Sequence, residues 1–135
     1  MPLISVTRLK LRNVLYLPRL LPFSLRSTWQ AKRAPGNLGV KLLQDRNLAF
    51  WTCTAWTDEG AMRRFMRADA HGQAMTKLMD WCSEASVVHW QQDQPDLPDW
   101  QEAHRRMIAE GRPSKVNHPS AAHQAFQVDP PRLAQ

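Results

Sequence analysis

Residues 47–56, NLAFWTCTAW, and residues 86–90, SVVHW, have the apolar composition of β-strands, and residues 58–85, DEGAMRRFMRADAHGQAMTKLMDWCSEA, separate them. The intervening segment opens with Asp58 and Glu59, acids that the N-terminus of a helix favours. Its later apolar residues recur at helical spacing. A strand, a helix and a returning strand fit a small sheet that holds a ligand.

The preceding sequence supplies the rest of the fold. Residues 3–11 and 38–44 alternate apolar and polar positions, which predicts two further strands. Between these strands, the spacing of Leu21, Leu25 and Trp29 predicts a helix whose Leu25 and Trp29 face inward. The resulting order is βαββαβ, the α+β arrangement called ferredoxin-like.

The strand at residues 48–56 is apolar on both faces. We therefore expect helices to cover one face of the sheet and a second subunit to cover the other. We assign residues 1–92 to the core and residues 93–126 to an extra C-terminal helix and an extended segment packed on it. Residues 127–135 are expected to form a disordered tail.

The composition limits the class of protein. The chain has 135 residues and a net charge of +6, and nine basic residues stand against one acid in the first 46 positions. Such a basic half fits nucleic acid, anionic lipid, an acidic ligand or a plain solvated face. The apolar run VLYLPRLLPFSL, residues 14–25, is too short and too interrupted for a transmembrane span, although peripheral contact with a membrane stays open.

Cysteine usage and targeting signals point to the cytoplasm. Cys53 and Cys82 lie in apolar surroundings, which predicts buried free thiols in a reducing compartment. The N-terminal region lacks the continuous apolar run and cleavage site of a signal peptide.

His71 is the leading candidate for chemistry. It opens a helical stripe that continues through Met75 and Leu78 and should point toward the sheet. An imidazole there fits a general base, a haem ligand or a hydrogen-bonded core histidine. Nearby tryptophans fit a pocket wall or core, and arginines fit partners for a ligand's carboxylate or phenolate, or solvated surface. The candidate pocket residues are Trp29, Arg33, Trp51, Arg64 and Met75.

Several other activities are disfavoured. The chain has no phosphate-binding glycine loop, zinc-finger spacing or nucleophile elbow. RNA-recognition domains share the βαββαβ order, but residues 48–56 lack the glycine and basic positions of their signature. Nucleic-acid binding would instead depend on the N-terminal cations Arg8, Lys10 and Arg12.

The block FWTCTAWTDEGAMRRFMRADAHGQAM, residues 50–75, resembles the strand–helix–histidine core of the dimeric α+β barrel superfamily, which includes antibiotic-biosynthesis monooxygenases. Residues 87–126 resemble the C-terminal segment of a bacterial family within it, some of whose members are compared with spheroidene monooxygenase. The resemblance implies a homodimer in which two four-stranded sheets close into a barrel. It also implies a cavity in each subunit for a small hydrophobic or aromatic ligand.

The resemblance further implies a monooxygenase that acts with or without haem. Without a cofactor, the substrate must be an easily deprotonated phenol or enol, and His71 matches the position of a base. With haem, His71 would be the axial ligand, and Met75 and Trp29 would pack on the macrocycle. A ligand-binding protein of the same fold without catalytic activity is the alternative, since a fold does not determine an activity.

Overall fold

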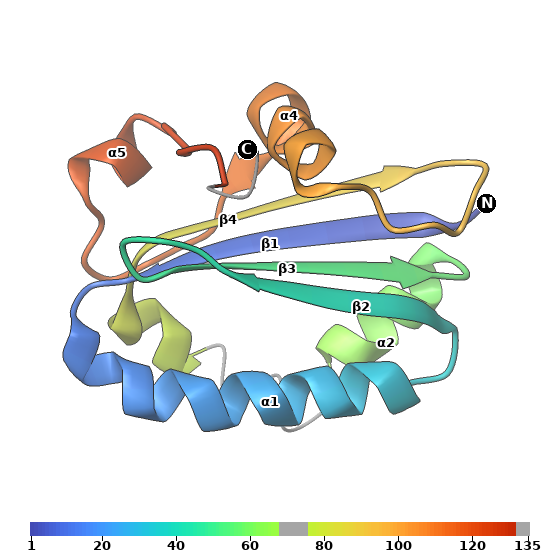
Figure 1. Ribbon diagram of the computed structural model, residues 1–135, viewed down its shortest axis with the longest axis horizontal. Helices are drawn as coiled ribbons and strands as arrows, with labels where there is room; N and C mark the ends of the chain where they lie inside the picture. Colours follow the sequence, from blue (N-terminus) through green and yellow to red (C-terminus); the bar gives the residue numbers. More distant parts are fainter. Residues whose placement is uncertain (68–75, 132–135) are drawn as a thin grey trace.

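The computed structural model describes residues 1–67 and 76–131, which form a five-stranded sheet with helices on both faces (Figure 1). All strand pairs are antiparallel, and the order across the sheet is β2-β3-β1-β4-β5. The strands are β1 (Leu3–Leu11), β2 (Asn37–Gln44), β3 (Ala49–Trp56), β4 (Cys82–Gln91) and β5 (Arg112–Pro113). The helices are η1 (Val14–Tyr16), α1 (Leu17–Arg33), α2 (Glu59–Met66), α4 (Trp100–Glu110) and α5 (Ala121–Gln124), and residues 76–81 are also helical.

The first four strands and the helices between them have the predicted βαββαβ order, so the α+β ferredoxin-like fold is confirmed. The central strand β1 pairs with β3 on one side and with β4 on the other. The hairpin between β2 and β3 turns at Asn47 and Leu48, which both have positive φ angles, 59° and 64°. Two such residues match the twist of a tight hairpin.

The boundaries of two elements differ from the prediction. α1 begins at Leu17, so Pro22 lies inside the helix. β4 begins at Cys82, inside the segment 58–85 whose later apolar residues have helical spacing, because Cys82 pairs with Leu11 of β1. Pairing with a strand far away in the sequence therefore overrides the local helical spacing that placed Cys82 on a helix.

On the sheet face opposite α1, a helix of the same chain packs on the strands. α4 lies across this face in Figure 1. Its Ala103 and Met107 are completely buried against Ile4, Val6 and Trp51 of the sheet. The C-terminal helix thus supplies the apolar cover that the alternating strand pattern requires.

Val128, near the C-terminus, packs on α4. Val128 is buried in the same cluster as α4, and its carbonyl oxygen lies 2.9 Å from His104 Nε2 of that helix. Through this contact and its burial, Val128 packs on α4. The structure does not describe residues 132–135.

Both thiols are free and fully buried, as predicted. Burial raises the pKa of Cys53 to about 12, against the opposing charge of Lys41, and burial likewise raises the pKa of Cys82 to about 12. Because the thiolate is the reactive form, we expect neither cysteine to react with a chromogenic disulfide reagent in the native protein at neutral pH. Both should react after unfolding, and rapid native labelling of either would contradict the burial.

Candidate functional site

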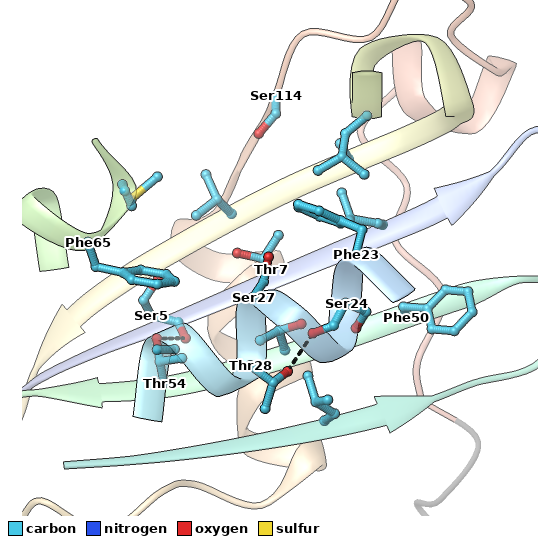
Figure 2. A pocket seen from close by; sticks show the side chains of 18 of the residues that line it. Ser5, Thr7, Phe23, Ser24, Ser27, Thr28, Phe50, Thr54, Phe65 and Ser114 are labelled. Atoms are coloured by element: carbon cyan, nitrogen blue, oxygen red, sulfur yellow. Dashed lines mark hydrogen bonds between the residues drawn. The ribbon is translucent and has the colours of Figure 1, made fainter. Parts of the chain in front are cut away.

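A cavity of about 350 Å³ lies between α1 and the sheet (Figure 2). Its floor is the face of β1, β3 and β4 that points toward α1, and its roof is the inner face of α1. Residues of α2, of the helical segment at 76–81 and of the stretch after β5 close its sides. The volume lies within the range of small-molecule pockets.

The floor carries a band of polar side chains across three strands. On β1, Ser5 stands opposite Thr54 of β3 and His89 of β4. One step along, Thr7 stands opposite Thr52. All five residues line the cavity, because residues two apart on a strand share one face.

The roof is also polar. α1 turns Ser24, Ser27 and Thr28 toward the sheet, as Figure 2 shows. The Thr28 hydroxyl donates to the carbonyl of Ser24 at 2.8 Å. These side chains are small, so they do not fill the space between helix and sheet, and the cavity is the result.

Apolar side chains surround the polar band. They come from every element around the cavity and include aromatic rings at several points of the wall. They are Leu9, Leu20, Phe23, Val40, Leu42, Phe50, Trp56, Met62, Phe65, Met66, Leu78, Met79 and Val87. The cavity therefore suits a molecule with an apolar body and one or more polar groups.

His89 is the one imidazole among the described residues that line the cavity. Its Nε2 atom is buried and has no hydrogen-bond partner within residues 1–67 and 76–131. Burial is the main cause that lowers the pKa of His89 below its ordinary 6.5, and the positive charge of Arg112 comes next. The charge of Glu59 opposes this shift, and that of Arg63 adds to it. A neutral imidazole with an unused nitrogen can accept a proton from a ligand.

Cations accompany His89. Arg112 pairs with Val87 across β4 and β5, and both line the cavity together with Lys115. None of the described lining residues is acidic. The cavity therefore favours a ligand that is anionic or becomes anionic.

Of the six sequence-predicted site residues, the structure describes four, and none of these four lines the cavity. His71 and Met75 lie outside the described residues. Trp29 is 58% exposed on the outer side of α1, where the Arg33 guanidinium carbon lies 4.5 Å from the centre of its ring. Arg64 is exposed on α2. Trp29 does not line the cavity, because the inner face of α1 is the one that carries Ser24 and Thr28.

Trp51 is fully buried on the other face of the sheet. Its indole nitrogen donates to Asp45 at 3.3 Å, and its ring contacts Trp100 and His104 of α4, with centroids 6.4 and 6.2 Å away. On β3 it alternates with Thr52, so it cannot share the cavity face. Its role is in the core beneath α4.

Sequence reasoning missed His89 and the hydroxyl band. A usable signal was present: Ser5 and Thr7, and Thr52 and Thr54, each stand two residues apart in a predicted strand. Such pairs place hydroxyls on one face of a buried sheet. His89 continues that face on β4, but only the strand register reveals it.

The N-terminal cations do not form an open surface for nucleic acid. Arg8 is 3% exposed and its Nη1 lies 2.7 Å from Glu84 Oε1. Lys10 Nζ lies 3.6 Å from the other oxygen of Glu84. Arg12 donates to the carbonyl of Asp80 and to the Tyr16 hydroxyl. Glu84 thus pairs with Arg8 and Lys10, whereas Arg12 is exposed, so the three cations do not form one free patch.

Haem, which the resemblance implies, does not match the described lining. A tetrapyrrole is a flat apolar ring with an axial ligand. His89 Nε2 could serve as a ligand, but Ser5, Thr7 and Ser27 carry hydroxyls into the space where the ring needs apolar contact. We therefore assign no chemistry to haem. Residues 1–67 and 76–131 also contain no cluster of three or more side chains suited to a metal ion.

Comparison with known proteins agrees with this fold. The family model described as antibiotic biosynthesis monooxygenase matches residues 29–77. SnoaB, a cofactor-independent oxygenase from Streptomyces nogalater, superposes with a TM-score of 0.58 at 20% identity over 73% of this chain and 98% of its own. A structure described as an antibiotic biosynthesis monooxygenase gives 0.61 at 14% identity over 68% and 99%.

A third structure, PA3566 from Pseudomonas aeruginosa, gives a TM-score of 0.61 at 15% identity over 69% of this chain and 95% of that one. No curated protein sequence matches the chain. At these identities the structural neighbours show the fold. The chain is thus similar to the antibiotic biosynthesis monooxygenases over residues 29–77 and shares the ferredoxin-like fold of these solved structures.

Proposed function

We propose that this protein binds a small phenol or enol in the cavity beneath α1 and oxidises it with dioxygen without a cofactor. The observation that carries the proposal is the buried Nε2 of His89, which has no partner in the described part of the chain. The described residues that line its cavity include cations and no acid. The similarity to oxygenases of the same fold supports the reaction class. A homodimer, which the resemblance implies, is a separate proposal.

In this scheme the neutral His89 takes the proton of the substrate hydroxyl, and Arg112 stabilises the resulting anion. The anion is electron-rich and passes an electron to dioxygen, after which the two radicals combine. A phenol and one dioxygen then give a quinone and one water. The four electrons that reduce dioxygen all come from the substrate, so the balance needs no external reductant.

We expect the His89→Ala variant to lower kcat/KM by about 10²–10⁴-fold, the range for loss of a general base. The kcat/KM values of both proteins are measured from oxygen uptake with a panel of one-ring and two-ring phenols and enols. In the wild type, kcat/KM should decrease in acid as His89 becomes protonated. The midpoint of this decrease should lie below pH 6.5, because the pKa of His89 is lowered. His118→Ala removes an exposed histidine and is the matched control.

A second variant separates binding from chemistry. Ser27→Leu places a larger side chain in the roof of the cavity and should abolish ligand binding, measured by fluorescence titration. His89→Ala should still bind the ligand. Turnover that survives in His89→Ala at the wild-type rate would contradict the assignment. His71→Ala, measured beside it, tests the sequence-based prediction for that residue. Bound ligand without oxygen uptake in any protein would favour the non-catalytic alternative.

A further inference from the structure

α1 buries Leu20 against the core but presents a second set of large apolar side chains to solvent. Leu25 is 69% exposed and Trp29 is 58% exposed, and Leu15, just before the helix, is 76% exposed. Pro18 and Pro22 are exposed as well. From Pro18 to Trp29 the spacing is four, three and four residues, so these side chains form one continuous face. We name it the outer face of α1.

Positive charges flank this outer face. Arg19, Arg26 and Arg33 stand seven residues apart, which is close to two helical turns, so they form one row. Lys32 lies on the other flank, and all four cations are exposed. The sequence has no acid before Asp45, so nothing on α1 neutralises them.

We propose that α1 lies flat on an anionic lipid surface, with Leu25 and Trp29 in the lipid and the flanking cations at the headgroups. An amphipathic helix of this composition binds the membrane interface by combining apolar burial with attraction to anionic headgroups. Tryptophan is enriched at that interface. Arg33 stacks on the ring of Trp29, and this contact holds charge and aromatic ring together at the same surface.

Two other partners fit the outer face less well. A second copy of the same helix would bring its four cations against the same four, and this like-charge contact is unfavourable. A nucleic acid would use the cations but would leave Leu25 and its apolar neighbours without a partner, because phosphate contacts supply most of such binding. Anionic lipid complements both the charges and the apolar face.

The position of α1 relates this surface to the cavity. In Figure 1 the helix forms the outermost layer on its side of the sheet. The cavity lies between this helix and the sheet. Leu42 and Met66 line the cavity and are also 41% and 36% exposed, so the cavity reaches the surface beside α1. A lipid-dissolved ligand could enter there. That route rests on the proposed function, whereas docking to lipid does not.

Co-sedimentation with vesicles tests the docking. We expect the full chain to bind vesicles of phosphatidylcholine mixed with phosphatidylglycerol and to leave vesicles of phosphatidylcholine alone in solution. Leu25→Ser combined with Trp29→Ser should weaken binding at least tenfold. Arg26→Gln and Arg33→Gln should each weaken it about fivefold, the effect of about 1 kcal/mol per cation near the surface, and added salt should do the same.

Ile108→Ser is the control, because Ile108 is 50% exposed on α4 at the opposite side of the sheet. It should bind like the wild type. Equal binding by all variants, or none by the wild type, would overturn the proposal. So would a dimer in lipid-free solution that Leu25→Ser with Trp29→Ser dissociates, or tight RNA binding that the same double variant leaves unchanged. His89→Ala should dock normally, so docking and catalysis can fail separately.

Discussion

Replacing Glu84 with alanine is expected to destabilise the protein by about 3–5 kcal/mol, the loss seen when one partner of a buried ion pair is removed. Glu84 and Arg8 have side chains only 7% and 3% exposed, and they are 2.7 Å apart. Arg8 Nε already lacks a partner among the described residues, so the variant would leave a buried guanidinium without its counterion. Denaturant unfolding at neutral pH measures the change.

Glu59→Ala provides a matched control at the surface. Its ion pair with Arg63 is also short, 2.8 Å, but the two side chains are 54% and 56% exposed. Pairs of this kind contribute less than about 1 kcal/mol. Replacing both Arg8 and Glu84 with leucine should recover most of the loss. If Glu84→Ala costs no more than Glu59→Ala, the buried pair is not important for stability.

The same pair should make the fold sensitive to acid. Burial alone would raise the pKa of Glu84, but the hydrogen bond and charge of Arg8, with help from Lys10 and Ser120, outweigh it and lower the pKa below 4.5. A lowered folded pKa stabilises the protein above the unfolded value, and this contribution is lost as the pH falls through the folded value. Glu84→Gln should remove that part of the acid dependence, which unfolding curves across the acid range would show.

The sequence predicts the sheet well because alternation of apolar and polar residues is a local signal. The strands at residues 3–11 and 48–56 differ from the observed bounds by one residue at most. The sequence does not predict which element covers the sheet face opposite α1. A strand that is apolar on both faces shows that something packs on each, but it does not say whether a second subunit or α4 supplies the contact.

The cavity was not predicted, because the sequence does not show which face of α1 is buried. An amphipathic helix is expected to bury its apolar face. Here Leu25 and Trp29 face solvent, while Ser24, Ser27 and Thr28 face the sheet. Both faces have helical spacing, so periodicity predicts the helix but not which face is buried. Only the packed structure shows that the face with these hydroxyls, together with Leu20 and Phe23, forms the roof of a cavity.

His89 illustrates a second limit. Its strand pattern, VVHW, predicts alternation between two faces but does not say which face holds the ligand. Pairing of His89 with Ser5, and of Ser5 with Thr54, is a contact between three distant segments. Local composition favoured His71, because that residue precedes a clear helical stripe.

Ala103→Glu is expected to produce the largest loss after Glu84→Ala, several kcal/mol, because it buries a carboxylate without a partner. Ala103 is completely buried between α4 and the sheet, in contact with the cluster that holds Ile4, Val6 and Trp51. The variant can relieve the charge only by releasing α4, which exposes the apolar face of the sheet. We expect lower stability on denaturant unfolding together with self-association in light scattering.

Ala109→Glu is the matched control, since residue 109 is exposed on the same helix, and it should unfold and scatter like the wild type. The comparison also bears on assembly. In a barrel closed by two sheets, a second subunit would have to occupy the face that α4 covers. A wild-type dimer that persists with α4 in place must therefore bury another surface. A stable, well-defined dimer in Ala103→Glu alone would show that the sheet face can pair once α4 leaves it. Equal stability of the two variants would show that α4 does not hold this face.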